Sequence, residues 1–256
     1  MMHCSDANWS NSKKLWKQKF TKRQKNSTKR SGAHHNCMTA IVKLCPAAYD
    51  ESSVNEVVAC LRNGGVIIYP TETFYGIGSL FSNEHTLNRL FKIKQRDVNK
   101  PVLILIPDIS FIKKISPVIP PELEMLARHF WPGPLTLLMQ ASPHLCPLIT
   151  GPKHTVGVRI SSNPLVQCLL RLLQDGITST SANCAGGISP TSLEEIPDEL
   201  LHAVDMVIDG GKTPGGSPST ILDISKTPFT INREGAVSSK QIRKVLKTLG
   251  LHRKMI

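Results

Sequence analysis

The sequence predicts an α/β fold that forms one domain over residues 38–256. From residue 38 onward, apolar runs typical of strands alternate with segments of helical periodicity, at the spacings of α/β proteins. Hydrophobic residues make up 40% of the 256 residues, which is enough to bury a substantial core. This part of the chain contains no internal repeat and no long linker. A single α/β domain is therefore the expected architecture.

The first two elements expected are a helix and a strand. Ser53 and Glu56 form a capping-box pattern ahead of apolar residues at helical spacing. Gly64 follows as a helix stop. Residues 66–69 then predict a strand.

A second helix and a second strand follow. The apolar residues within 87–91 are spaced as on one face of a helix. Because Pro101 disfavours helical geometry at Lys100, this helix should end before Lys100. Residues 102–106 (VLILI) predict a buried strand.

The middle of the chain continues the alternation. Pro121 opens a helix with one apolar face. Asn163 and Pro164 supply the cap and a favoured first residue for another helix. The strands expected in this region are residues 135–139, 156–160 and 177–180.

The last part of the chain predicts two helices. Ser192 and Glu195 form a second capping box, which indicates a short helix. The amphipathic pattern over residues 238–249 predicts the closing helix, with Gly250 as its stop. The strands expected between these helices are residues 206–208, 220–224 and 230–232.

The net charge of +12 is unevenly distributed. Residues 1–37 contain nine Lys or Arg residues and one acidic residue, so the rest of the chain is only mildly basic. We interpret this leader as a disordered tail, or as sequence upstream of translation that starts at Met38. Two alternatives are an arm that binds RNA weakly through residues 1–37 and an organelle transit peptide.

Cysteine usage and hydropathy bear on the compartment. The seven cysteines are odd in number and scattered, without a C-x-x-C pair, which favours a reducing compartment. His34, His35 and Cys37 are a possible metal site, although four ligands are hard to assemble there. Because no apolar run approaches the ~20 residues that span a bilayer, we expect no membrane segment and a cytoplasmic protein.

Three cations lie where the second predicted helix gives way to a strand. Lys94, Arg96 and Lys100 all precede the strand at residues 102–106. A solvated basic cap would explain them, because helix C-termini attract cations. Three cations at one chain reversal also suit a polyphosphate. The segment by itself leaves both interpretations open.

The familiar nucleotide-binding signatures are absent. Residues 211–213 (GKT) resemble the end of a P-loop, but the opening glycine of that motif would fall at Met206. Gly76 and Gly78 lack the third glycine of a dinucleotide fingerprint. If the chain binds a nucleotide, it does so without those motifs.

Two other segments carry polar side chains suited to a ligand. Residues 179–183 (STSAN) follow a predicted strand, and their hydroxyls suit phosphate or ribose, although a Ser/Asn-rich turn is the alternative. Arg159 lies in the strand at residues 156–160, on the face opposite Val156 and Val158. Such an arginine usually faces solvent, but its planar fork also suits a carboxylate.

Six segments of the chain occur in a characteristic order. They are residues 64–78 (GGVIIYPTETFYGIG), 92–101 (KIKQRDVNKP), 130–139 (FWPGPLTLLM), 155–160 (TVGVRI), 179–191 (STSANCAGGISPT) and 209–224 (DGGKTPGGSPSTILDI). In this order they closely resemble the YrdC/TsaC family of threonylcarbamoyl-AMP synthases, over roughly residues 40–250. The resemblance implies a single-domain open, twisted, mixed sheet with flanking helices.

The resemblance also implies two sets of binding residues. Lys94, Arg96 and Lys100 would be catalytic, because they would neutralise the phosphates of ATP and help pyrophosphate to leave. The ATP-binding set is Arg96, Lys100, Thr155, Ser181, Asn183, Ser189 and Arg233, and the threonine-binding set is Thr73, Arg159, Ser179 and Ser219.

The reaction that the resemblance implies joins L-threonine, bicarbonate and ATP into L-threonylcarbamoyl-adenylate and pyrophosphate. The product would pass to a tRNA threonylcarbamoyl transferase complex for the t6A modification. Mg2+ is implied as a cofactor carried mainly by the phosphates of ATP. No side-chain nucleophile is required, so catalysis would consist of positioning and charge stabilisation.

The chain departs from the family pattern in two ways. The family often places a histidine near the end of the strand after the cation cluster, and residues 103–107 contain none. The chain also ends ~20 residues after Arg233, so we expect no counterpart of the C-terminal domain of longer relatives.

Two other classes of function stay open from sequence. A nucleic-acid-binding module would use the cations on a phosphodiester, but would not explain Arg159 or residues 179–183. The carbamoyl-adenylate-forming domain of hydrogenase maturation proteins is the nearer enzymatic alternative. Those proteins carry further segments, including zinc motifs, for which this chain has no room.

Overall fold

The computed structural model describes residues 39–44, 50–248 and 250, and all of them belong to one compact unit that spans residues 38–256. The leader at residues 1–37 lies outside the described residues, and so do the predictions that fall on it: RNA binding and the metal site at His34, His35 and Cys37. Within the described part of the chain, every helix is too short or too polar to cross a membrane.

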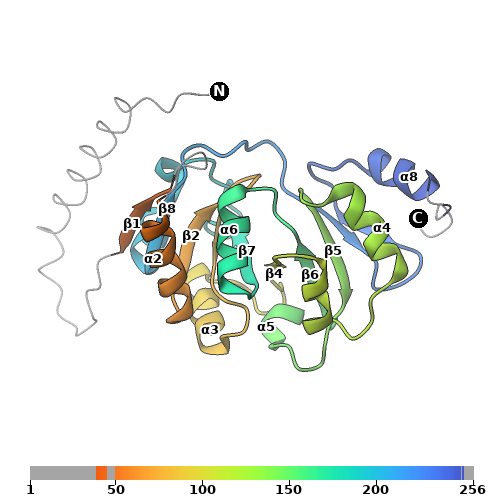
Figure 1. Ribbon diagram of the computed structural model, residues 1–256, viewed down its shortest axis with the longest axis horizontal. Coiled ribbons are helices and arrows are strands. Elements are labelled where there is room, and N and C mark those ends of the chain that lie inside the picture. The colour runs from red at the N-terminus through yellow and green to blue at the C-terminus, as the bar shows by residue number, and fades with distance from the viewer. Residues whose placement is uncertain (1–38, 45–49, 249, 251–256) are drawn as a thin grey trace, which may run out of the picture. The chain divides into compact units, whose positions relative to one another are not determined.

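One sheet of ten strands organises the described residues, in the order β1-β8-β2-β3-β7-β4-β6-β5-β9-β10 (Figure 1). The sheet is mixed, since it contains parallel pairs such as β1 with β8 and β4 with β6 and antiparallel pairs such as β2 with β3 and β5 with β6. The expected α/β class and open mixed sheet are confirmed. The strands are β1 (Ala40–Lys43), β2 (Ile67–Pro70), β3 (Tyr75–Gly78), β4 (Leu103–Leu105), β5 (Leu135–Gln140), β6 (Thr155–Arg159), β7 (Ile177–Ser181), β8 (Met206–Asp209), β9 (Thr220–Asp223) and β10 (Thr230–Arg233).

Helices flank the sheet. The predicted cap at Asn163 is confirmed, because its side-chain oxygen accepts hydrogen bonds from the backbone of Leu165 and Val166. The helices are α2 (Glu51–Arg62), α3 (Glu84–Lys94), α4 (Pro121–Phe130), α5 (Pro147–Thr150), α6 (Pro164–Leu173), α7 (Asp198–Ala203) and α8 (Ser239–Thr248), with the 3-10 turns η1 (Ile109–Lys114) and η2 (Leu193–Glu195).

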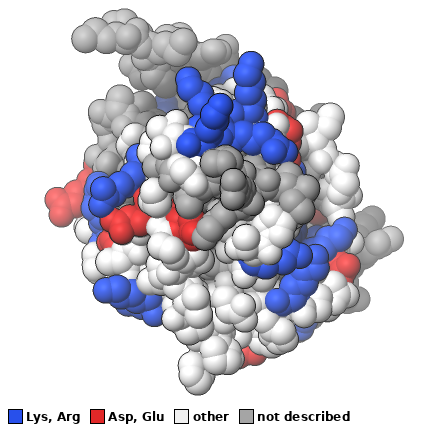
Figure 2. Space-filling model, turned by 90° about the vertical axis from the view of Figure 1, so that its right-hand side faces the viewer, with Lys and Arg blue, Asp and Glu red and all other residues white. Residues whose placement is uncertain are grey.

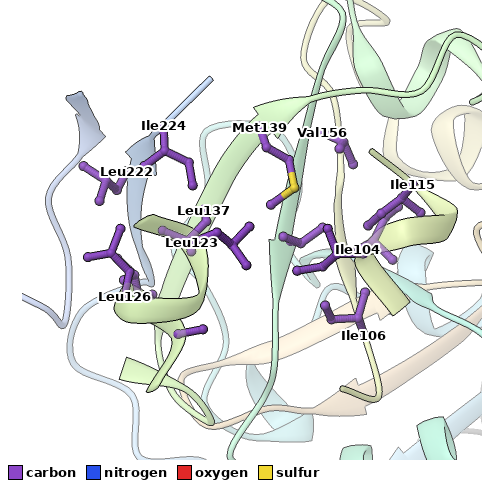
Figure 3. Packing of buried hydrophobic residues seen from close by; sticks show 14 of the residues in the cluster. Ile104, Ile106, Ile115, Leu123, Leu126, Leu137, Met139, Val156, Leu222 and Ile224 are labelled. Atoms are coloured by element: carbon purple, nitrogen blue, oxygen red, sulfur yellow. The ribbon is translucent and has the colours of Figure 1, made fainter. Parts of the chain in front are cut away.

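A first hydrophobic cluster packs α4 and α8 against one face of the strands β4, β6, β5 and β9. Ile104, Val158, Leu137 and Leu222 are register neighbours across these strands, and all four are fully buried. Leu123 of α4 packs on this row beside Leu137 (Figure 3). Burying this face leaves the alternate residues of the same strands on the opposite face of the sheet.

A second hydrophobic cluster packs α2 and α6 against β1, β2 and β8. Four residues are fully buried: Val57 and Leu61 of α2 and Leu169 and Leu170 of α6. The two helices lie side by side over these strands in Figure 1. Ile177 of β7 belongs to this cluster, and β7 is the neighbour of β4, whose Ile104 belongs to the first cluster.

The closing helix α8 has one apolar and one basic face. Ile242 and Leu246 are fully buried in the first cluster. Figure 2 shows Lys and Arg side chains gathered at the upper part of this end of the molecule, where α8 lies. The exposed cations of α8 are Lys240, Arg243, Lys244 and Lys247.

Two predicted capping boxes are wrong in detail. Asp50, not Ser53, caps α2, because its carboxylate accepts from the backbone N–H of Ser53 at 2.8 Å. Ser192 makes no side-chain cap, and Glu195 instead accepts from the backbone N–H of Thr191 at 2.6 Å. In both places an acidic side chain accepts a backbone hydrogen bond near the start of the element, and the serine side chain does not act as the cap.

Candidate active site

A cavity of about 520 Å³ opens on the face of the sheet opposite the first hydrophobic cluster. Val156 and Val158 of β6 belong to that cluster, whereas Gly157 and Arg159 line the cavity. Its volume lies in the range of small-molecule sites, roughly 300–1,000 Å³. The sequence-predicted residues that line it are Thr73, Arg96, Lys100, Thr155, Arg159, Ser179, Ser181, Ser189, Ser219 and Arg233.

Arg96 is held rigidly at one end of this cavity. Its Nε donates to the carbonyl of Lys100 at 2.7 Å, and its Nη2 donates to the carbonyl of Pro101 at 2.8 Å. Its Nη1 donates to the hydroxyl of Thr180 on β7 at 3.2 Å. Burial lowers the pKa of Arg96, although the nearby carboxylate of Asp97 opposes that shift. The guanidinium is therefore preorganised near the C-terminal end of β7.

The side chain of Lys100, unlike that of Arg96, is not held by hydrogen bonds to other described residues. Its residue is exposed and lines the cavity, and within the described part of the chain its ammonium has no hydrogen bond or ion pair. A turn fixes its backbone, because Asn99 donates to the carboxylate of Asp97 at 2.9 Å. The backbone is thus anchored while the ammonium remains available to a ligand.

Lys94 and Asn183 are the predicted residues that do not line the cavity. Lys94 ends α3 and is only 6% exposed. Its ammonium donates to the carbonyls of Ser181 and Asn183 and to the side-chain oxygen of Asn183. Burial, and secondarily the charge of Arg96, lower the pKa of Lys94 to about 8. In this arrangement Lys94 holds the turn that presents Ser181.

The loop after this turn uses glycine to change direction. Gly186 has φ +79°, a conformation that other residues rarely adopt, and a Cβ there would meet nothing within 4 Å. The side-chain amide of Asn183 donates to the carbonyl of Gly187. The loop then returns the chain to Ser189, which lines the cavity. Asn183 therefore stabilises the loop that carries Ser189, although Asn183 itself does not line the cavity.

Arg159 is buried at another part of the cavity wall. Its side chain is 3% exposed, so the solvent-facing alternative for this strand residue is wrong. The opposite-face prediction from alternation with Val156 and Val158 is confirmed. Its Nε lies 3.2 Å from Oε1 of Glu72, a carboxylate that the sequence analysis did not single out.

Ser219 and Arg233 form a third group. The guanidinium of Arg233 donates from Nε and Nη2 to the carbonyl of Ser219, at 3.0 and 2.8 Å. The hydroxyl of Ser219 lies 3.1 Å from Nη2 and 3.1 Å from the hydroxyl of Thr136 on β5. Partial burial, and then the charge of Arg159, lower the pKa of Arg233. The two arginines are therefore close enough to influence each other.

Thr73 lies in the loop that joins β2 to β3. Its hydroxyl is 3.2 Å from the hydroxyl of Thr71, which donates to the carbonyl of Phe74 at 2.7 Å. The backbone carbonyl of Thr73 accepts from Gly215 at 2.8 Å. The loop thus holds Thr73 in place from two directions.

Comparison with known proteins agrees with this fold and cavity. The model of the Sua5/YciO/YrdC family, described as "Telomere recombination", matches residues 59–235. The chain belongs to the Sua5/YciO/YrdC family. The resemblance found in the sequence is therefore confirmed.

Curated relatives of this Sua5/YciO/YrdC protein include threonylcarbamoyl-AMP synthases from two prokaryotes. The one from Pyrococcus abyssi is 34% identical over 203 residues, which cover 79% of this chain and 60% of the relative. The one from Vibrio vulnificus is 36% identical over 174 residues, which cover 67% of this chain and 94% of the relative. The chain thus spans about three fifths of the length of the Pyrococcus relative.

Solved structures of the family superpose well on this protein. Pyrococcus abyssi Sua5 in complex with L-threonine has a TM-score of 0.76 at 33% identity, covering 81% of this chain and 60% of that chain. Escherichia coli YciO has a TM-score of 0.71 at 28% identity, covering 78% of this chain and 97% of that chain. Full-length HypF in a phosphate- and nucleotide-bound form shares only the fold, at 18% identity and a TM-score of 0.63.

Several lining residues of this family member were missed from the sequence. Lys153 lines the cavity from the exposed loop before β6. Its only sequence signal as a site residue was its position just before the strand that carries Arg159. Thr136 and Asn232 also line the cavity, each on a strand that was predicted without a site residue at that position. Leu103 lines the cavity in the segment where the family often has a histidine.

The site carries cations and hydroxyls without acidic metal ligands. Among the described residues, no Asp or Glu lines the cavity, and no group of three or more His, Cys, Asp or Glu side chains is placed to hold a metal. This donor set fits an anionic ligand whose own oxygens bind a metal. The hydroxyl and cationic groups that line the cavity would contact the anion instead.

Proposed function

We propose that this protein is a threonylcarbamoyl-AMP synthase, a nucleotidyltransferase that forms L-threonylcarbamoyl-adenylate and pyrophosphate from L-threonine, bicarbonate and ATP. The observation that carries the proposal is that one cavity is lined both by Arg96 with Lys100 and by Arg159, which we assign to two different anionic groups of the substrates. The names of the family relatives support the same reaction.

The phosphate end of the proposed site is formed by Arg96 and Lys100. Arg96 is fixed by three hydrogen bonds, and Lys100 has an anchored backbone and an ammonium that has no partner among the described residues. Such cations bind phosphate oxygens through charge-assisted hydrogen bonds. Ser181 and Ser189 add hydroxyls at the same cavity, while Thr155 and Arg233 remain proposed ATP contacts.

The threonine end of the proposed site is centred on Arg159. Its guanidinium would bind the carboxylate of L-threonine, and Thr73, Ser179 and Ser219 would contact the rest of the amino acid. Ser179 and Ser181 are two residues apart on β7. A separation of two residues along a strand places both side chains on the same face, and both residues line the cavity.

The proposed chemistry requires no protein nucleophile. The amine of L-threonine combines with CO2 from bicarbonate to form a carbamate and release a proton. One carbamate oxygen then forms a bond to the α-phosphorus as the bond to the pyrophosphate oxygen breaks. Arg96 and Lys100 would stabilise the charge that develops on the leaving pyrophosphate, and Arg159 would hold the attacking group in line. Bound Mg2+, with phosphate and water as ligands, would neutralise further phosphate charge.

The direct test is incubation with ATP, Mg2+, bicarbonate and isotopically labelled L-threonine, followed by chromatography for the labelled adenylate. We expect pyrophosphate and the adenylate to appear in equal amounts, and only when both threonine and bicarbonate are present. Pyrophosphate release that does not depend on threonine would refute the proposal. Carbamoyl-adenylate made from carbamoyl phosphate would favour the hydrogenase-maturation type of reaction instead.

The proposed product is an activated carbamoyl group with a defined use. We propose that it passes to a tRNA threonylcarbamoyl transferase complex, which would place the group next to the anticodon. We propose that the adenylate passes to the transferase in the cytoplasm, where tRNA modification would take place. Co-incubation with a purified transferase and tRNA should convert the labelled adenylate into labelled tRNA, whereas no transfer would refute the hand-off.

A further inference from the structure

A buried ion pair joins the cavity wall to a loop on the other half of the sheet. Glu72 lies in the loop between β2 and β3, and Arg159 ends β6. The side chains of Glu72 and Arg159 are 8% and 3% exposed, and Oε1 lies 3.2 Å from Nε. Of the two residues, only Arg159 lines the cavity.

Glu72 is itself held from the side opposite the cavity. The hydroxyl of Ser161 donates to Oε2 of Glu72, and the same hydroxyl accepts from the backbone N–H of Asn163 at 3.2 Å. Asn163 caps α6. The carboxylate is therefore fixed through Ser161 to the start of a helix in the second hydrophobic cluster.

The contact occupies one edge of the guanidinium of Arg159. The ion pair uses Nε, and within the described part of the chain no hydrogen bond to another residue is formed by Nη1 or Nη2. An arginine grips a carboxylate through Nε with one Nη, or through both Nη groups. With Glu72 at Nε, only the edge formed by the two Nη groups is left for a ligand.

We propose that Glu72 is a positioning residue that makes Arg159 bind the substrate carboxylate through its Nη1–Nη2 edge. The inference rests on the proposed function, because it takes the carboxylate of L-threonine as the ligand of Arg159. Glu72 does not contact the substrate. It acts by fixing the rotation of the guanidinium, which sets the direction from which the carbamate oxygen formed on the threonine amine reaches the α-phosphorus.

A purely stabilising role for this pair fits the geometry less well. Although the distance between Oε1 and Nε is that of an ion pair, neither atom forms a hydrogen bond. Burying two charges costs desolvation energy, which an ion pair recovers only with good hydrogen bonds. The pair is thus a weak source of stability, but it is well placed to orient a charged fork beside a cavity.

The test is a double-mutant cycle with Glu72→Gln and Arg159→Lys, in which apparent KM values for L-threonine and ATP are measured. Glu72→Gln should raise the KM for threonine about tenfold, because a charge-assisted contact becomes misaligned. The KM for ATP should stay within about twofold. In the Arg159→Lys background, which lacks the planar fork, Glu72→Gln should change the threonine KM by less than about twofold.

Loss of the carboxylate leaves Arg159 buried without a counter-charge, so Glu72→Gln is expected to lower stability. Glu72→Asp is the second variant, because it keeps the charge and withdraws the carboxylate by one methylene group. It should raise the threonine KM by a smaller factor while its unfolding midpoint stays closer to that of the wild type. Glu124→Gln is the matched control, since it removes an exposed glutamate that pairs with Arg128 outside the cavity at 2.6 Å.

The outcomes separate this inference from the function on which it rests. The positioning role is supported if substituting Glu72 raises the threonine KM in the wild-type background and no longer raises it in the Arg159→Lys background. If both Glu72 variants keep the wild-type threonine KM, or if the effects of the two residues multiply, Glu72 does not act through Arg159. A wild-type protein that makes no adenylate and binds no L-threonine overturns both proposals.

Discussion

Replacing Lys94 by methionine tests whether this lysine supports the site or touches the nucleotide. The substitution keeps most of the length of the side chain but removes three contacts, to the carbonyls of Ser181 and Asn183 and to the amide oxygen of Asn183. Each carbonyl left without a partner costs about 1–3 kcal/mol. We therefore expect a loss of about 2–4 kcal/mol in the free energy of unfolding, or roughly 5–15 °C in the melting temperature.

The activity of the Lys94→Met protein should fall through the turn that it loosens. Because Ser181 ends β7 immediately before that turn, we expect the apparent KM for ATP to rise about tenfold while the KM for threonine changes less. The assays are thermal unfolding and steady-state formation of the adenylate, with Lys92→Met as control because Lys92 is exposed on the same helical turn. An unchanged melting temperature combined with lost ATP binding would refute the supporting role. The ammonium would then contact phosphate directly, as the sequence resemblance implies.

Three further predictions follow from the same geometry. Arg96→Ala should lower turnover about tenfold to a hundredfold while Lys92→Ala leaves it unchanged, as steady-state kinetics would show; equal activity removes Arg96 from the site. Gly78→Ala should destabilise the protein by about 2 kcal/mol or more in urea unfolding, because its Cβ would lie 1.7 Å from the carbonyl oxygen of Thr178; wild-type stability would contradict the close strand contact. The pKa of Lys94 is lowered from 10.5 to about 8, so the unfolded chain binds more protons between these values. Relative to Lys94→Met, the wild type should therefore gain up to about 1.4 kcal/mol of stability per pH unit in that range, and a flat difference would show that Lys94 does not titrate there.

The sequence predicted the elements whose patterns are long and regular. The helices α4 and α6 and the strands β5, β6 and β7 were expected near their observed positions, because apolar periodicity and helix-capping residues identify them. The strands β1 and β3 were missed. β3 reads YGIG, and two glycines in four residues give a weak strand signal. It forms because β2 and β7 pair with it on both sides, and that pairing is a tertiary effect.

The sequence predicted those residues of the candidate site that belong to family motifs. Resemblance brought together distant residues such as Arg96 and Arg233, and the structure places both at one cavity. It did not indicate that Lys94 turns its ammonium to backbone carbonyls, because hydrogen bonds of that kind leave no pattern in the sequence. Glu72 was missed for a similar reason. Its partner Ser161 is 89 positions away, and a single glutamate in a loop carries no periodicity.

The charges of the cavity restrict what it can bind. Arg96, Lys100, Lys153, Arg159 and Arg233 all line it, and among the described residues no carboxylate does. Glu72 neutralises part of this charge from behind the wall, at Arg159 alone. A ligand with one strongly anionic end and one carboxylate would match this distribution, because the unpaired cations would face the phosphates and the paired arginine would face the carboxylate. A neutral ligand would leave several cations partly desolvated without a partner, so the site disfavours it.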